Sequence, residues 1–301
     1  MLQTFNPVNA NLIVNINGRL VHRDEAGVSP FDSAVQNGDA VWEGLRLYNG
    51  RIFRLEQHLD RLRRSAAMLQ YARFPDDDYL VEQLKRTLAA NKMTDGVHVR
   101  LTVSRGVKYT SGLDSRINTR GCSLFILAEF KPPVYDRRGI TLVTSSIRRP
   151  LANVLNQHIH SCNQLTSILA KLEANAAGAD DALMLDTDGF LAETNATHVF
   201  VVKGGVVETS TTRACPEGIT RAAVLELCAR HQIPHGVLDI TLGEVYGADE
   251  IFCTGTMGEL APVVKLDGKP ISSGVPGPVL TRLAGLFGEM TSDPAEGWKV
   301  V

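Results

Sequence analysis

Cysteine is scarce in this chain, and no two cysteines are close in sequence. Five occur among 301 residues, and no pair has the CxxC spacing of many zinc sites and redox motifs. An odd number of scattered cysteines is typical of free thiols in a reducing compartment. We therefore expect a cytoplasmic protein without disulfides.

Long apolar runs and long basic runs are also absent. A helix needs about 18 or more mostly apolar residues to cross a bilayer, so we expect no membrane-spanning segment. A net charge of −2 without a basic run argues against nucleic acid as a partner. The first residues, MLQTFNPVNANLIV, lack a basic region followed by an apolar core, so we expect no signal peptide.

What the sequence contains is ordinary for a globular protein: 44% of its residues are apolar and 21% are charged. The length predicts two domains. Lys131-Pro132-Pro133 interrupts both strand and helix. We place a small α+β domain at residues 1–128, a linker at 129–137 and a larger domain at 138–301.

Asn-Gly turns and apolar periodicity predict the elements of the first domain. Residues 12–21 and 41–53 are predicted as hairpins, each with an Asn-Gly turn. Alternating apolar residues predict half-buried strands at 97–105 and 122–130, and spaced leucines predict helices from residue 55 and over 77–91.

The second domain is predicted to hold strands at 140–146, 182–185, 198–202, 206–207 and 250–254, and helices that begin near 219 and 277. Residues 153–174 lead from a polar stretch into another helix. On that helix Leu165, Ile168, Leu169 and Leu172 fall at the spacing i, i+3, i+4, i+7, so they share one face.

Two short segments have the composition of an anion site. Gly218-Ile219-Thr220 begins a predicted helix, where unpaired N–H groups and the helix dipole favour phosphate. Thr254-Gly255-Thr256 ends a predicted strand with small hydroxyl residues. Arg61 is a candidate cationic partner for the same anion.

His158, His160 and Cys162 alternate along the chain. In an extended segment they would point to one side, as ligands of zinc or another soft metal. The alternative is that one histidine faces a pocket while the others pack or form hydrogen bonds. Because no fourth ligand is evident, we predict no metal site.

Six motifs in order resemble those of fold-type IV pyridoxal-phosphate enzymes. That group includes branched-chain aminotransferases, D-amino acid aminotransferases and aminodeoxychorismate lyases. The resemblance covers about residues 13–290. The motifs are GDAVWEGLR at 38–46, HLDRL at 58–62, residues 163–174, GFLAETNATHVF at 189–200, GITR at 218–221 and TGTMGELAPV at 254–263.

The resemblance implies an α+β fold of two domains, with a β-barrel-like core in the larger one. It also implies a homodimer in which a small-domain loop of the partner closes the pocket. The implied cofactor is pyridoxal 5'-phosphate or pyridoxamine 5'-phosphate. The implied small-molecule partner is an amino acid or keto acid.

The resemblance assigns cofactor-binding roles to five residues. Arg61 matches the arginine that grips the phosphate. Ile219, Thr220 and Thr256 match the backbone and hydroxyl donors to the same group. Glu193 matches the carboxylate that faces the pyridine nitrogen, which keeps the ring protonated and able to accept electrons.

Four further residues are assigned to the substrate by the same resemblance. Trp42 matches the aromatic wall of the pocket, and Arg100 lies on a strand that lines it. Met257 and Gly258 match the turn whose N–H groups hold the substrate carboxylate.

One departure changes the expected chemistry. The family has a lysine, in Schiff-base linkage to the cofactor, three or four residues before the position of Asn163. Those positions hold His160 and Ile159, and neither has a primary amine. The tyrosine that usually follows the family's asparagine is replaced here by Gln164. The asparagine that is common near the end of the glutamate motif is replaced by His198. Lys171 is expected to have no catalytic role.

His160 has a side chain that titrates near neutral pH, so it is our candidate catalytic acid/base. We therefore expect a branched-chain-aminotransferase-like enzyme whose cofactor is held without a covalent link. Two alternatives remain open. One is a lyase or hydrolase that uses His160 in the same pocket, with or without cofactor. The other is a non-catalytic protein that binds a metabolite or the cofactor.

Overall fold

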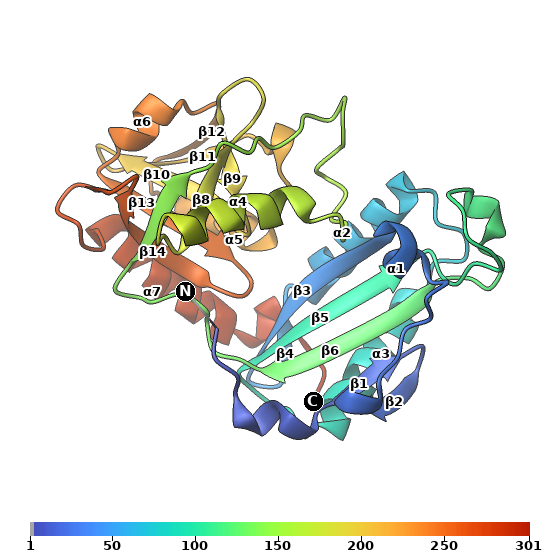
Figure 1. The fold of residues 1–301 in the computed structure, drawn as a ribbon. Helices are drawn as coiled ribbons and strands as arrows, with labels where there is room; N and C mark the ends of the chain where they lie inside the picture. Colours follow the sequence, from blue (N-terminus) through green and yellow to red (C-terminus); the bar gives the residue numbers. More distant parts are fainter. Residues whose placement is uncertain (1–2) are drawn as a thin grey trace. The chain divides into compact units, whose positions relative to one another are not determined.

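The computed structural model describes residues 3–301 (Figure 1). The contacts between these residues divide them into two compact units. The N-terminal unit consists of Thr4–Pro132, Ile159–Asn163 and Thr291–Val301. The C-terminal unit consists of Pro133–His158 and Gln164–Met290, together with Gln3. Two short segments far along the sequence therefore belong with the first half of the chain.

A seven-stranded antiparallel sheet forms the N-terminal unit, and Figure 1 shows its long strands β3, β5 and β6 side by side. Asn17 and Gly18, and again Asn49 and Gly50, have the positive φ angles of tight hairpin turns, which confirms both predicted hairpins. In order across the sheet, the strands are β16 (Gly297–Lys299), β4 (Arg51–Phe53), β3 (Ala40–Tyr48), β5 (Val97–Ser104), β6 (Ser123–Phe130), β1 (Ile13–Ile16) and β2 (Arg19–His22).

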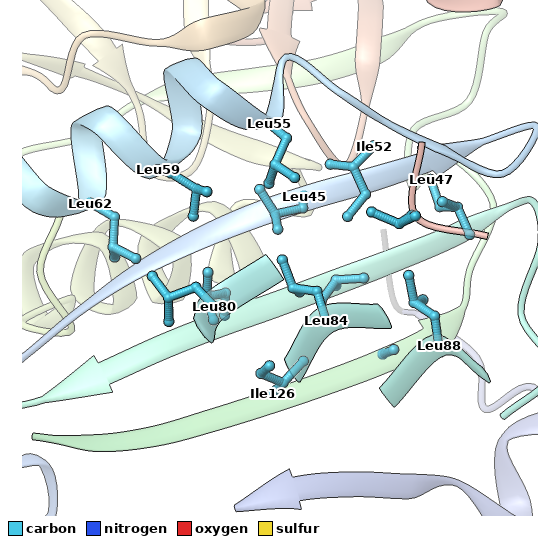
Figure 2. Close-up of a cluster of buried hydrophobic side chains, with 14 of the residues drawn as sticks. Leu45, Leu47, Ile52, Leu55, Leu59, Leu62, Leu80, Leu84, Leu88 and Ile126 are labelled. Atoms are coloured by element: carbon cyan, nitrogen blue, oxygen red, sulfur yellow. The ribbon is translucent and has the colours of Figure 1, made fainter. Parts of the chain in front are cut away.

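Two helices, α2 (Leu55–Met68) and α3 (Asp77–Ala90), cover one face of this sheet. Their leucines recur every third or fourth residue, so each helix turns a continuous apolar stripe to the strands. Figure 2 shows the leucines of both helices against β3 and β6: Leu55, Leu59, Leu62, Leu80, Leu84 and Leu88, facing Leu45 and Ile126. The unit also contains α1 (Ser33–Asn37), η1 (Pro7–Asn11), η2 (Arg23–Glu25), η3 (Ser115–Ile117) and η5 (Pro294–Glu296).

The segment Ile159–Asn163 lies along the start of β3. The Trp42 N–H donates to the His160 carbonyl at 3.0 Å, and the Cys162 N–H donates to the Ala40 carbonyl at 2.8 Å. Val41 and Ser161 form an isolated antiparallel bridge. These bonds fix the main chain around His160, one of the two positions where the resemblance expects a lysine.

A nine-stranded mixed sheet forms the core of the C-terminal unit. Its end strand β9 packs against β10 and β11, so the sheet curls toward a barrel, as predicted. In order, the strands are β12 (His235–Leu238), β11 (Val206–Ser210), β10 (His198–Lys203), β13 (Glu250–Gly255), β14 (Glu259–Leu266), β7 (Ile140–Thr144), β8 (Asp181–Leu185) and β9 (Leu191–Thr194), with β15 (Lys269–Pro270) beside β14.

Four helices and one short 3-10 turn accompany this sheet: α4 (Leu165–Ala176), α5 (Ile219–Arg230), α6 (Leu242–Tyr246), α7 (Pro278–Ser292) and η4 (Thr212–Ala214). No helix within residues 3–301 has the length and apolar character needed to cross a membrane.

Helix α4 has its apolar stripe on the outside. Leu165, Ile168, Leu169 and Leu172 are 41–66% exposed, whereas its buried face consists of the small residues Ser167, Ala170 and Ala174. The helix itself is confirmed. Its exposed face is too apolar to be explained by contact with water alone.

Candidate functional site

In the N-terminal unit, three basic side chains surround the buried carboxylate of Glu43. Glu43 on β3 faces α2, where His58 and Arg61 are three residues apart and so lie on one side of the helix. Arg61 donates to both carboxylate oxygens, from Nε at 2.8 Å and from Nη2 at 2.6 Å. His58 Nδ1 lies 2.6 Å from Glu43 Oε2.

This cluster is close to electrically neutral. Burial acts to raise the pKa of Glu43, but the charge of Arg61 and the neighbouring His160 outweigh it, so the pKa lies well below its usual value. Burial lowers the pKa of His58, and Glu43 only partly opposes this. Glu43 is therefore ionised, His58 is neutral, and Arg61 balances the one negative charge.

His160 completes the same cluster. Its Nδ1 lies 2.6 Å from the main-chain oxygen of Trp42 and 3.6 Å from Glu43 Oε1. Its own main-chain N–H donates to Ser65 Oγ at 3.0 Å. Burial lowers the pKa of His160, and the charge of Arg61 acts in the same direction. His160 is thus a neutral imidazole in a fixed position.

Three of the predicted site residues stack on one another. The His160 and Trp42 rings lie 4.4 Å apart between centroids, and the Arg100 guanidinium lies 3.9 Å from the Trp42 ring centroid. Arg100 also donates to Cys162 Sγ at 3.6 Å. With Arg61, the structure therefore brings together all four site residues predicted in this unit.

In the C-terminal unit, Glu193 on β9 is paired with an arginine that the sequence analysis did not identify. Arg149 Nε lies 3.0 Å from Glu193 Oε1, and both side chains are buried. Arg149 also donates from Nη2 to Ser167 Oγ at 2.9 Å and to the Thr194 carbonyl at 3.2 Å. The arginine thus places a fixed positive charge beside the carboxylate.

Helix α5 begins at Ile219 with Gly218 as its N-cap, and no side chain caps it. A Cβ on Gly218 would lie 2.3 Å from the His198 ring, so only glycine permits this close packing. Thr220, in the first turn, is buried. A 12-residue helix with an uncapped N-terminus and a nearby hydroxyl suits a phosphate group.

The turn between β13 and β14 holds the remaining predicted residues. Thr256, Met257 and Gly258 form it, and the Gly258 N–H donates to the Gly255 carbonyl at 3.2 Å. That N–H is thus used within the turn, and its predicted role toward a substrate carboxylate stays a prediction. The Met257 carbonyl accepts from the Val134 N–H at 3.0 Å.

These C-terminal features lie on neighbouring elements. His198 pairs with Thr254 between β10 and β13, and it also packs against Gly218. Cys215, just before α5, is close enough to Glu193 for the carboxylate to add to the effect of burial and raise the pKa of the thiol. Thr254 is 1% exposed, and its Oγ1 has no hydrogen-bond partner within residues 3–301. An orphaned buried hydroxyl beside an uncapped helix fits an anionic group.

The three residues of the alternating histidine and cysteine pattern do not converge. His158 belongs to the C-terminal unit, where Nε2 lies 2.8 Å from the Thr212 carbonyl. His160 and Cys162 belong to the N-terminal unit and have the partners given above. Within residues 3–301, no three side chains of the metal-binding types form a group able to hold a metal ion.

Lys171 is held on α4 by a different set of contacts. Its Nζ lies 3.2 Å from Asp181 Oδ1 and also donates to the Asp180 carbonyl. Asn195 donates to the same Asp181 oxygen at 3.2 Å. These contacts suit a structural lysine.

A curled mixed sheet, a buried carboxylate beside an arginine, and an uncapped helix beside threonines are the features that the resemblance expects in the larger domain of the fold-type IV class. The comparisons agree with this class. The chain belongs to the amino-transferase class IV family, whose model matches residues 40–266.

Two curated relatives illustrate the similarity. "Branched-chain-amino-acid aminotransferase-like protein 2" of Arabidopsis thaliana is 49% identical over 286 residues, which is 95% of this chain and 51% of that protein. The branched-chain-amino-acid aminotransferase of Pseudomonas aeruginosa is 31% identical over 293 residues, or 94% of each chain. The chain thus spans about half the length of the plant relative.

Solved structures give the same result for the fold. The branched-chain aminotransferase of the archaeon Thermoproteus uzoniensis, solved with norvaline, matches with a TM-score of 0.87 and 27% identity, over 97% of this chain and 100% of that one. The Escherichia coli branched-chain amino acid aminotransferase matches with a TM-score of 0.87 and 26% identity, over 96% and 99%. The predicted fold class is confirmed.

Three residues of the site were missed from sequence. Glu43 and His58 lie inside the motifs GDAVWEGLR and HLDRL, so the motifs contained the signal, but neither residue was singled out. Arg149 follows a strand with no distinguishing pattern around it. Its partner is 44 residues away in sequence, from 149 to 193, and only the folded sheet brings them together.

Proposed function

We propose that the chain is a branched-chain-aminotransferase-like enzyme that holds pyridoxal or pyridoxamine 5'-phosphate without a covalent link and acts on an amino acid or its keto acid. The observation that carries the proposal is the placement of His160. A buried neutral imidazole, fixed beside Glu43 and Arg61, occupies one of the two positions, 159 and 160, where the resemblance expects the family's lysine. It can move a proton, but it cannot form an imine.

The residues of the C-terminal unit would hold the cofactor. Ile219 and Thr220 offer the phosphate their main-chain N–H groups and a hydroxyl, and Thr256 offers another donor. Glu193, which is paired with Arg149, is the proposed partner of the pyridine nitrogen. When bound, the cofactor ring supplies an electron sink for a carbanion at the substrate α-carbon.

The residues of the N-terminal unit would supply charge and proton transfer. Arg61 is the proposed cationic partner of the phosphate, with Glu43 holding its guanidinium in one orientation. His160 is the proposed acid/base. Trp42 and Arg100, stacked face to face, form a rigid wall for the substrate, while Met257 and Gly258 of the C-terminal unit are the proposed turn for its carboxylate.

Cofactor titration tests this proposal. Pyridoxal 5'-phosphate, followed by absorbance or calorimetry, should bind to the full chain. Thr220→Val should weaken binding by roughly 1–2 kcal/mol through loss of one hydrogen bond. Thr281→Val, which removes an exposed hydroxyl on α7, is the matched control. No binding at millimolar cofactor would overturn the proposal and favour a lyase, hydrolase or binding protein without cofactor.

Borohydride tests the non-covalent link. Reduction should leave no phosphopyridoxyl adduct on any peptide of residues 153–174, Lys171 included. In His160→Lys, and separately in Ile159→Lys, an adduct and amino-group transfer should appear in one of the two variants. Absence of the adduct and of amino-group transfer from both variants would mean that the pocket serves a different reaction.

We further propose that the active form is a homodimer in which the apolar stripes of α4 from two copies meet. The stripe exposes four large aliphatic side chains in a row, and the family resemblance implies a dimer. A twofold interface brings the same patch of both copies together, which suits a single self-complementary helix face.

A further inference from the structure

The His160 ring is constrained on the side of Nδ1. The atom 2.6 Å from Nδ1 is the main-chain oxygen of Trp42, and a carbonyl oxygen can only accept a hydrogen bond. Nδ1 must therefore carry the proton in the neutral ring. The second nitrogen, Nε2, is then left with its lone pair.

The position of the ring is constrained as strongly as its tautomer. The His160 main chain is tied at both ends, by its N–H to Ser65 Oγ and by its carbonyl to the Trp42 N–H, each at 3.0 Å. The Trp42 side chain stacks on the imidazole face, and its Nε1 donates to the Ser161 carbonyl at 3.0 Å. Rotation of the imidazole by half a turn would replace the Nδ1 bond with a C–H group.

The surrounding charges decide how readily this ring takes a second proton. On the α2 side, Arg61 opposes a positive imidazole, and His58 is neutral. On β3, Glu43 Oε1 lies 3.6 Å from His160 Nδ1 and favours a positive imidazole. On β5, the Arg100 guanidinium lies 3.9 Å from the Trp42 ring centroid and is a second positive group near this cluster. Glu43 is the one acidic side chain in this set.

We propose that His160 acts through Nε2, that the Trp42 carbonyl fixes this choice, and that Glu43 is the positioning residue that makes proton uptake at Nε2 possible. The inference deepens the proposed function and rests on it for the role of the proton. A proton leaving the substrate α-carbon would bind the Nε2 lone pair, and the resulting imidazolium would share its charge with Glu43. Nε2 would then release the same proton, so the ring ends neutral.

Nitrogen NMR of the full chain, without cofactor, tests the tautomer. The eight histidines are ¹⁵N-labelled, and His160 is assigned by the signals lost in His160→Gln. At pH 7.5 we expect the shifts of a ring protonated at Nδ1 and bare at Nε2. A ring protonated at Nε2, or one that exchanges between both tautomers, would overturn the proposal. This measurement needs no other variant to fold.

The role of Glu43 is tested by the titration midpoint of the same signals. Glu43→Gln removes the negative charge beside the ring and should move the His160 midpoint downward. Glu43→Asp keeps the charge and should move it less. A midpoint equal to the wild type in Glu43→Gln would show that Glu43 has no influence on the proton. If Glu43→Gln does not fold, the His160 midpoints of Glu43→Asp and wild type are compared instead. Equal midpoints in these two proteins would overturn the role of Glu43.

The two proposals fail in different ways. If the cofactor does not bind, the proposed function fails while the Nδ1-protonated tautomer stands. If the cofactor binds and His160 is protonated at Nε2, only the present inference fails.

Discussion

Arg149 and Glu193 form a buried ion pair, with Arg149 Nε 3.0 Å from Glu193 Oε1. The arginine lies just after β7 and the glutamate on β9, so the pair joins the loop before α4 to one end of the curled sheet. The contacts of Arg149 with Ser167 and Thr194 hold its guanidinium, and so its charge, beside the carboxylate. The predicted role of Glu193 toward a pyridine nitrogen therefore depends on a residue outside every recognised motif.

Removing only the arginine should destabilise the protein strongly. Arg149→Met leaves Glu193 buried without its cation, which typically costs about 3–5 kcal/mol. The double variant Arg149→Met/Glu193→Gln should recover part of that loss, because no charge is then left uncompensated. Urea unfolding of wild type, both single variants and the double variant measures the coupling. Purely additive losses would contradict a direct pair.

Gly218 and Gly285 make a matched pair of glycine substitutions. A Cβ on Gly218 would lie 2.3 Å from the His198 ring, whereas a Cβ on Gly285 in α7 meets nothing within 4 Å. Gly218→Ala should therefore lower the free energy of unfolding by roughly 1–3 kcal/mol. Gly285→Ala should raise it by about 0.5–1 kcal/mol, since alanine favours the helix.

Only Gly218→Ala should also weaken cofactor binding, because the start of α5 must shift. Urea unfolding and cofactor titration of both variants give the two readouts. Equal stability changes in the two variants would show that His198 moves aside without strain.

Local patterns in the sequence predicted most helices and hairpins, because interactions between residues close in sequence form these elements. The turns at Asn17-Gly18 and Asn49-Gly50, and the leucine stripes of α2 and α3, each depend on residues within a few positions. Strands without a strong pattern were missed, among them β12, β14 and β16. β16 is stabilised by pairing with β4, and no nearby sequence signal indicates that partner.

The site was predicted in part for the same reason. Motifs identified Arg61 and Glu193 but not their partners Glu43 and Arg149. These partners are distant in sequence and come into contact only in the folded protein. The pairing of residues 160–162 with β3 joins positions about 120 apart, from 42 to 160. Periodicity also predicted α4 correctly, yet it could not indicate that the apolar face of this helix would remain uncovered.

His98 should make the protein sensitive to acid. Its Nε2 is buried with no hydrogen-bond partner among residues 3–301. Burial, together with the charges of Lys131, Arg46 and Arg100, lowers the pKa of His98 to about 3. An unfolded histidine titrates near pH 6.5. Between those two values the unfolded chain binds a proton that the folded chain does not, so stability is lost as the pH falls through this window.

His98→Gln should flatten that dependence. In wild type this one group should contribute a loss of up to about 1.4 kcal/mol for each pH unit below 6.5. Urea unfolding at pH 7.5 and pH 4.5 measures the slope. His231→Gln is the control, because that histidine is exposed. If wild type and His98→Gln lose the same stability on acidification, His98 is not the group that titrates.

The exposed stripe of α4 predicts the oligomeric state. If the stripes of two copies meet across a twofold axis, each residue of the stripe occurs once from each copy in the interface. A charge introduced in one copy then faces the same charge in the other copy. Ile168→Asp should then produce a monomer, because two like charges and two lost apolar contacts oppose the same association. Light scattering should give wild type at twice the chain mass of 32.8 kDa and this variant at the single mass.

The matched control is Val275→Asp, which places the same charge on another exposed aliphatic residue of the C-terminal unit. Val275 is 63% exposed and Ile168 is 53% exposed, so the two substitutions are comparable in accessibility. The control should remain a dimer. A wild type of 32.8 kDa would refute the dimer itself, and a dimeric Ile168→Asp would place the interface on a different surface. A monomeric Ile168→Asp that also loses cofactor affinity would show that the α4 interface supports the site.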